Sequence, residues 1–129
     1  MAVRKRKRRA VKKKHYKIRG YVRYRKIAYS YRSKLEKKVL LSFLKRKEVI
    51  KVQLEVAVPY LDSTGRRRYC RPDFLVQTIE CTMVIEAKGS HLLSDYLSSD
   101  KHKGTILWCQ ERNFGYRVVT SEGRILKFR

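Results

Sequence analysis

The chain has 129 residues, with 34 Lys and Arg against 11 Asp and Glu, and a formal net charge of +23. One domain fits this length, and two do not fit comfortably. Hydrophobic residues make up 43% of the chain, which is enough for a core and excludes disorder throughout. The charge argues against an acidic ligand-buffering protein and a neutral metabolic enzyme. No stretch approaches the roughly 18 consecutive apolar residues that a membrane span needs.

The positive charge is concentrated at the N-terminal end. Residues 1–35 contain 16 basic side chains and no acidic one, whereas residues 36–129 contain 18 basic and all 11 acidic residues, a net +7. We therefore predict a basic nucleic-acid-binding arm over residues 1–30 and a folded domain over 31–129. Neutralised phosphates and released counterions would drive binding; an anionic membrane surface is the weaker alternative. The candidate contacts in the arm are Arg4, Lys5, Arg6, Arg8, Arg9, Lys12, Lys13, Lys14, Arg23 and Arg25.

Tyrosines alternate with cations in the second half of this arm. They are Tyr16, Tyr21, Tyr24, Tyr29 and Tyr31. Such rings stack on bases while neighbouring cations hold phosphates. The alternative is that some of them pack the arm onto the domain, and the sequence leaves both open.

The cysteines indicate no disulfide framework. Cys70, Cys81 and Cys109 are odd in number and form no CxxC pair, which also argues against a zinc finger. We expect three reduced thiols in or near the core, in a reducing compartment.

The first predicted element of the domain is a helix over residues 33–47. Ser33 and Glu36 have the spacing of a capping box. Apolar residues then recur at helical spacing. They are Leu35, Val39, Leu40, Phe43 and Leu44. Glu36 borders this apolar stripe, and its role in the cap explains it without any catalysis.

Three strands are predicted next, over residues 50–58, 69–77 and 82–88. The first alternates apolar and polar residues and ends at Pro59. A turn signal over 62–65 separates it from the second strand, and Gly89 and Ser90 end the third. Two hairpin connections give a three-stranded antiparallel meander.

The segment 98–112 suits either a buried strand or a helix that Gly104 interrupts. We favour the helix, with Ser98 or Ser99 as its cap, because a strand would leave one face of the sheet poorly covered. A strand over 116–120, a turn over 121–123 and a short strand over 124–128 complete the chain.

The third strand carries a candidate site. Alternation places Glu86 and Lys88 on one face of an otherwise apolar strand. A tight hairpin would bring Asp73 beside Glu86. Two adjacent carboxylates repel each other unless a divalent cation lies between them, and such oxygen ligands suit Mg²⁺ or Mn²⁺. Lys88 would then orient a water molecule or stabilise the transition state, and Glu36 would be a further ligand or position water.

In chain order these elements are a helix with Glu36, three strands with Asp73 on the second and Glu86 and Lys88 on the third, and then a helix and a strand. This order resembles the PD-(D/E)xK nuclease superfamily, and more closely the phage endonuclease I type of Holliday-junction resolvase. Transposon endonuclease subunits of the TnsA type are a close second. The resemblance implies an α/β fold with an αβββαβ core, in which a mixed sheet is flanked by helices. It covers residues 29–128, and the matching stretches are 31–36, 58–60, 71–75, 84–89 and 118–121.

The resemblance also implies a function, namely Mg²⁺-dependent cleavage of branched DNA by a homodimer. Asp73 and Glu86 would be metal ligands together with the Ala87 backbone carbonyl, Lys88 the catalytic lysine, and Glu36 the remaining acidic site residue. Resolvases of this type exchange elements between subunits. The segment 61–68 here instead has the composition of an ordinary hairpin.

Further residues are expected at the nucleic acid. Arg66, Arg67 and Arg68 follow the predicted turn, and Ser90 and His91 follow the site strand, where loops commonly reach backbone phosphates. For His91 and His102 we expect phosphate contact or solvent exposure rather than catalysis. A non-catalytic packaging or ribosome-associated protein, in which the arm is the function, is the competing hypothesis.

Overall fold

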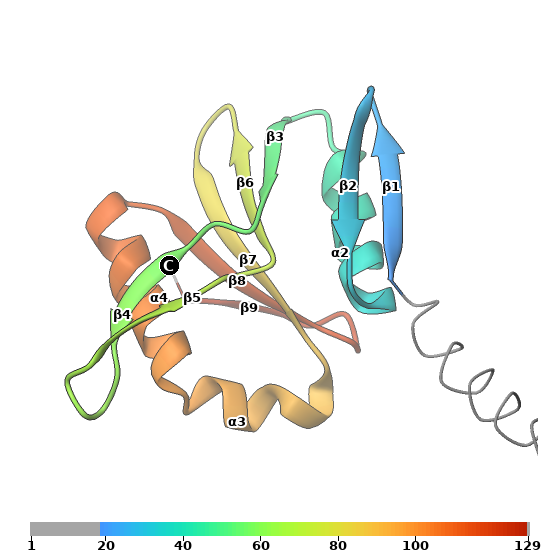
Figure 1. Ribbon diagram of the computed structural model, residues 1–129. Coiled ribbons are helices and arrows are strands. Elements are labelled where there is room, and N and C mark those ends of the chain that lie inside the picture. Colours follow the sequence, from blue (N-terminus) through green and yellow to red (C-terminus); the bar gives the residue numbers. More distant parts are fainter. Residues whose placement is uncertain (1–18, 129) are drawn as a thin grey trace, which may run out of the picture.

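The computed structural model describes residues 19–128, which form an α/β fold around a mixed five-stranded sheet (Figure 1). The sheet order is β3-β6-β7-β8-β9, in which β7 and β8 are parallel and all other neighbours are antiparallel. The strands are β3 (Val49–Leu54), β6 (Phe74–Thr78), β7 (Thr82–Lys88), β8 (Gly115–Thr120) and β9 (Ile125–Lys127). The helices are α2 (Lys34–Leu44), α3 (Leu93–Leu97) and α4 (Asp100–Arg112), with a 3₁₀ turn, η1 (Ser90–Leu92), before α3.

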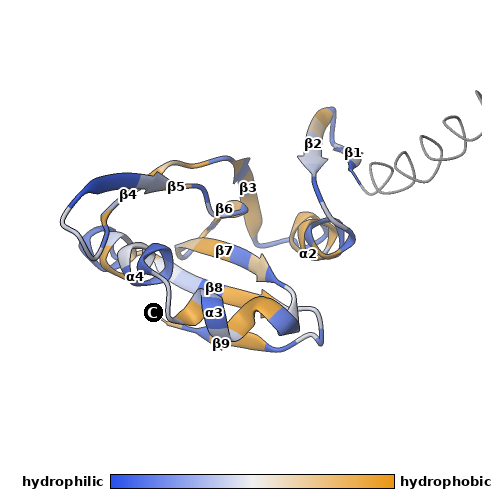
Figure 2. Cartoon of the chain, turned by 60° about the horizontal axis from the view of Figure 1, so that its bottom comes forward, coloured by the Kyte–Doolittle hydropathy of each residue, from blue (hydrophilic) through white to orange (hydrophobic). Residues whose placement is uncertain are grey.

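Two hydrophobic clusters lie on opposite faces of this sheet. Successive residues of a strand point to opposite faces, and on β7 Ile85 joins the cluster under α2 while Val84 joins the cluster under α4. Glu86 and Lys88 share the parity of Val84 and therefore face the side of α3 and α4. In Figure 2, β7 is hydrophobic along most of its length and becomes hydrophilic toward its end, where these two residues lie.

Of the two hydrogen bonds of the capping box predicted at Ser33, the one from the Glu36 N–H to the serine hydroxyl forms. The Ser33 hydroxyl accepts a hydrogen bond from the Glu36 N–H at 3.0 Å. The Glu36 carboxylate accepts from the backbone N–H of Arg32 at 2.8 Å, one residue before the expected position. The helix ends at Leu44 rather than at residue 47.

Two of the strand predictions are wrong, because each predicted range contains parts of two separate strands. The strand predicted over 50–58 is divided into β3 and β4 (Val58–Leu61), since Glu55 adopts a left-handed backbone with φ 58°. The strand predicted over 69–77 is divided into β5 (Arg67–Cys70) and β6. Pro72 lies at this break, where its missing N–H costs no ladder hydrogen bond. Strands β3, β6 and β7 still form an antiparallel meander.

The outer halves of these strands, β4 and β5, pair with each other as a separate two-stranded ribbon. The segment 61–68 thus closes as an ordinary hairpin within one chain. The ribbon packs along α4, and Gly104 allows the close approach, because a Cβ atom there would lie 2.2 Å from the Tyr60 Cβ. Gly104 is buried and does not interrupt the helix.

Helix α4 confirms the helical interpretation of 98–112. The Ser99 hydroxyl caps it by accepting a hydrogen bond from the His102 N–H. The last strand is shorter than predicted, covering Ile125–Lys127.

A further hairpin occupies part of the predicted arm. Strands β1 (Gly20–Tyr24) and β2 (Ile27–Tyr31) pair antiparallel and lie beside α2 (Figure 1). Tyr29 is buried in the α2 cluster and Tyr24 packs against it, whereas Tyr21 is 76% exposed. The boundary predicted at residue 30 therefore falls inside β2. Of the two alternatives for the tyrosines, packing onto the domain accounts for Tyr24 and Tyr29. Tyr16 lies outside the described residues.

The three cysteines are free, but they do not all lie near the core as expected. Cys109 is buried and Cys70 half-buried, whereas Cys81 is exposed in the β6–β7 turn. No helix in the described part of the chain has the length and apolar character to cross a membrane.

Candidate active site

The site is built at the point where β6 begins and β7 ends. Phe74 on β6 pairs with Ile85 on β7 in the antiparallel register, so the next position outward brings Asp73 opposite Glu86. Asp73 accepts a hydrogen bond on its Oδ2 from the Ala87 N–H at 2.7 Å. The break at Pro72 and the tight β6–β7 turn thus bring two carboxyl groups together, as the sequence predicted.

Burial makes this carboxyl pair electrostatically unusual. Glu86 is only 9% exposed. Desolvation raises the pKa of Asp73 to about 8, and the charges of Glu86 and Glu36 add to the increase. Desolvation also raises the pKa of Glu86, to about 6, although Lys88 and a hydrogen bond with the Asp73 side chain oppose the shift. Near neutral pH the pair therefore retains a proton in the absence of a cation.

These pKa values predict a stability that falls as the pH rises. Both carboxyl groups bind protons more tightly in the folded protein than in the unfolded chain, where their ordinary pKa values are 3.8 and 4.5. Their contribution to the free energy of unfolding is therefore greatest below pH 4 and is lost as the pH rises to about 8. Between pH 6 and 8 the loss comes from the last proton that the pair holds.

Urea unfolding in the presence of a chelator, at a series of pH values, measures this effect. The His102 side chain, whose pKa burial lowers, contributes with the opposite sign, so the informative quantity is the difference between the wild type and Asp73→Asn. We expect the wild type to lose stability relative to the variant as the pH increases. A difference that is constant across this range would contradict the buried pair.

Lys88 lies beside the pair. Its Nζ is 3.7 Å from Glu86 Oε1, and it also lies over the Tyr96 ring, 4.7 Å from the ring centroid. The Lys88 side chain is half-buried, at 26% exposed, so its ammonium has only limited contact with solvent. The geometry fits a lysine that assists chemistry at the carboxyl pair.

Glu36 contributes to the same site from the N-terminal turn of α2. Its carboxylate remains bonded to the Arg32 N–H, yet it lines the same cavity as Asp73 and Glu86 and interacts with both. The acidic residues predicted for the site are thus brought together, and Glu36 keeps its capping role as well.

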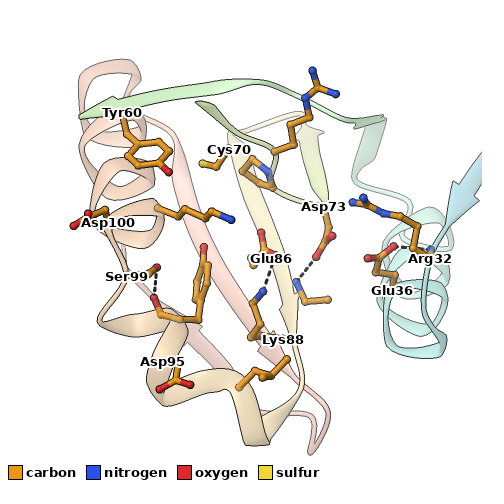
Figure 3. A pocket seen from close by; sticks show the side chains of 16 residues that line it. Arg32, Glu36, Tyr60, Cys70, Asp73, Glu86, Lys88, Asp95, Ser99 and Asp100 are labelled. Atoms are coloured by element: carbon orange, nitrogen blue, oxygen red, sulfur yellow. Dashed lines mark hydrogen bonds and ion pairs between the residues drawn. The ribbon is translucent and has the colours of Figure 1, made fainter. Parts of the chain in front are cut away.

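A cavity of about 660 Å³ opens over these side chains (Figure 3). Asp73, Glu86 and Lys88 lie at its centre, between a wall formed by Ser99 and Asp100 at the start of α4 and a wall that includes Glu36 of α2. Three further cations line it, namely Arg32, Arg71 and Lys101. Asp95 and Asp100 also line it, so the cavity combines the buried acidic groups with both cations and carboxylates around them, and it offers contacts to a cation and to an anionic ligand.

The donor set at the centre fits a hard divalent cation. Asp73 and Glu86 supply carboxylate oxygens that repel each other when both are ionised, and such oxygens suit Mg²⁺ or Mn²⁺. Among residues 19–128, no three His, Cys, Asp or Glu side chains form a ready-made metal cage. The structure connects Ala87 to the site through its N–H, and the role of its carbonyl stays a prediction.

The predicted nucleic-acid contacts divide between two hairpins and the loop after β7. Arg23 and Arg25 belong to the β1–β2 hairpin, and the three arginines 66–68 are exposed on the β4–β5 hairpin. Arg68 is paired with Asp62 at 2.6 Å, which leaves Arg66 and Arg67 as the hairpin's more available cations. The contacts predicted between Arg4 and Lys14 lie outside the described residues.

The loop after β7 is tied to the turn after β8. Ser90 donates its backbone N–H to the Ser121 hydroxyl at 3.0 Å. His91 is exposed, as expected, whereas the expectation for His102 is wrong. His102 is 4% exposed and its Nδ1 is bonded to the Tyr116 hydroxyl at 2.9 Å, because the α4 face that carries it packs against β8.

Sequence reasoning missed several residues of this site. Arg32, Tyr96 and Lys101 line the cavity from three separate segments. No spacing in the sequence connects them to the Glu-x-Lys strand, and only the tertiary fold does. Arg71 directly precedes the Pro-Asp pair, but the motif itself assigns it no role.

Comparison with known proteins adds no assignment. No protein-family model matches this chain, and no curated protein matches it either. The described fold and cavity are therefore the basis for any functional conclusion.

Proposed function

We propose that this protein is a metal-dependent DNA endonuclease that hydrolyses phosphodiester bonds, with branched DNA as its preferred substrate. The observation that carries the proposal is the buried pair of Asp73 and Glu86, with Lys88 beside it, in a cavity lined by acidic and basic side chains. A protein that only binds nucleic acid has no need for two adjacent buried carboxyl groups, because they cost stability near neutral pH.

The order of the elements supports a PD-(D/E)xK-like core. When the β1–β2 and β4–β5 hairpins, the short helices η1 and α3 and the last strand β9 are omitted, α2, β3, β6, β7, α4 and β8 follow one another as αβββαβ. Asp73 directly precedes the second strand of this core, and Glu86 and Lys88 end the third, which is the pattern that the sequence resemblance implies.

Each residue then has a distinct role in the proposed reaction. Asp73 and Glu86 would hold the divalent cation, and Glu36 would be a further ligand or position water near them. A bound Mg²⁺ would lower the pKa of a coordinated water molecule and offset the charge of the attacked phosphate. Lys88 donates hydrogen bonds to the attacking water or to the phosphate as negative charge develops.

The cationic side chains around the cavity support a DNA substrate. Arg32, Arg71 and Lys101 lie at the rim, where each would contact a phosphate next to the cleaved bond. The β1–β2 hairpin, with Arg23 and Arg25, lies beside α2 (Figure 1), and the β4–β5 hairpin, with the exposed Arg66 and Arg67, packs along α4. Two separate basic surfaces on either side of one site suit a substrate whose duplex arms diverge.

A second candidate is a non-catalytic nucleic-acid-binding protein. The net charge of +23 favours it, since binding alone would account for that charge. The carboxyl pair distinguishes the two functions, because only the nuclease uses it.

Incubation of labelled four-way and linear DNA with the protein and Mg²⁺ or Mn²⁺ tests the proposal. We expect cutting that needs the cation, is faster on the four-way substrate, and is lost in Asp73→Ala and Glu86→Ala. Binding without cutting under all conditions would favour the packaging function. Cutting retained by both variants would contradict the assigned site.

A further inference from the structure

The ammonium group of Lys88 is held by two contacts of different kinds. One is the ion pair with Glu86, at 3.7 Å. The other is with the face of the Tyr96 ring, whose centroid lies 4.7 Å away. A cation over an aromatic face is attracted by the ring quadrupole, and the attraction increases when water is excluded. Tyr96 is thus a direct neighbour of the proposed catalytic lysine.

Buried side chains also contact Tyr96 and restrain its ring. Its hydroxyl is bonded to the Tyr116 hydroxyl at 2.5 Å, which in turn is bonded to His102 Nδ1 at 2.9 Å. Tyr116 is fully buried, and the edge of the His102 ring packs against Phe128 with 4.5 Å between ring centroids. Burial raises the pKa of Tyr96 and of Tyr116, so both hydroxyls remain protonated. The ring also packs against the His102 ring, with 5.3 Å between centroids, and against the hydrophobic cluster under α4, so packing holds it over Lys88 in addition to the hydroxyl bond.

The two contacts respond differently when the site is in use. If Glu86 shares its charge with a divalent cation, its attraction for Lys88 decreases. The contact with the aromatic ring involves no carboxylate and persists. The ring would then be the main restraint on the position of the ammonium.

We propose that Tyr96 is a positioning residue that holds the Lys88 ammonium beside Glu86 through the face of its ring. This inference rests on the proposed nuclease function and goes beyond it by assigning a residue of α3 that no motif identifies. The ring supplies the effect and is held by packing, so the hydroxyl is not required for it.

A matched pair of variants separates the ring from the hydroxyl. Tyr96→Phe keeps the ring face, and it leaves Tyr116 bonded to His102, so no buried polar group is left without a partner. Tyr96→Leu removes the ring but fills much of the space. We expect Tyr96→Phe to cut four-way DNA at close to the wild-type kcat, and Tyr96→Leu to lose about tenfold in kcat with KM unchanged. Thermal melting shows whether each variant folds, and Tyr96→Met replaces the leucine variant if that one does not melt cooperatively.

An NMR measurement tests the placement without relying on activity. In protein with ¹³C-labelled lysine, the ring current of Tyr96 should shift the Lys88 ε-methylene protons upfield, and Lys88→Arg assigns the signal. The shift should persist in Tyr96→Phe and disappear in Tyr96→Leu. An unshifted Lys88 signal in the wild type, or equal losses of kcat in the two variants, would overturn the inference. If the wild type cuts no DNA but shows the shift, the proposed function fails while the placement of Lys88 is retained.

Discussion

Replacing Asp73 by asparagine is expected to reduce cation-dependent cleavage by at least about 100-fold, because the variant loses one of the two charges that hold the cation at the site. The amide oxygen of asparagine still accepts a hydrogen bond from the Ala87 N–H, so the local backbone should not change. The same substitution removes a carboxyl group whose pKa is raised by burial and, to a lesser extent, by repulsion from Glu86. We therefore expect the variant, without metal and above neutral pH, to be more stable than the wild type.

Two measurements on the same samples test this prediction. Single-turnover cutting of four-way DNA gives the rate, and thermal melting in a chelator gives the stability. Glu80→Gln is the matched control, since Glu80 is exposed in the β6–β7 turn and outside the cavity; it should change neither quantity appreciably. A slow variant that is also less stable would indicate that Asp73 supports the fold rather than the chemistry.

Neutralising the N-terminal basic residues is expected to weaken DNA binding strongly without changing the cutting step. The change replaces eight side chains by glutamine in the full-length protein: Arg4, Lys5, Arg6, Arg8, Arg9, Lys12, Lys13 and Lys14. Each phosphate that is no longer neutralised reduces the slope of log K against log salt by about 0.9, so the slope should become less steep by up to about 7. The single-turnover rate at saturating protein should remain at the wild-type value.

Fluorescence anisotropy with labelled duplex at several salt concentrations measures the slope. A variant in which Arg66 and Arg67 are replaced by glutamine is the comparison, and we expect its slope to become less steep by about 2. If the N-terminal variant keeps the wild-type slope, the charge of this segment serves some purpose other than binding phosphate.

The elements that the sequence predicts well are those whose signals are local. Ser33 and Glu36 specify the start of α2 through hydrogen bonds within four residues. Ser99 does the same for α4. The pairing of Asp73 with Glu86 is also predictable, because a tight turn between adjacent antiparallel strands leaves little freedom in their register. For this reason the centre of the candidate site could be identified from the sequence.

The elements that the sequence predicts poorly depend on contacts between distant segments. Apolar and polar residues alternate regularly over 50–58. Nothing in this pattern indicates the left-handed backbone conformation of Glu55, after which β4 leaves the sheet. Likewise, the burial of His102 depends on Tyr116 and Phe128, which come later in the chain. Tyr96 reaches Lys88 only because α3 folds back over the end of β7. Sequence reasoning therefore identified the acidic groups of the site but not the side chains that surround them.

Calorimetric titration of Mn²⁺ into the protein, near neutral pH and in buffers of different ionisation enthalpy, tests most directly whether Asp73 and Glu86 form a cation site. Because the pair retains a proton at this pH, saturable binding should release up to about one proton for each ion bound, and both the binding and the release should be lost in Asp73→Asn. No saturable binding by the wild type, or equal binding by the variant, would contradict the assignment of this carboxyl pair as a metal site.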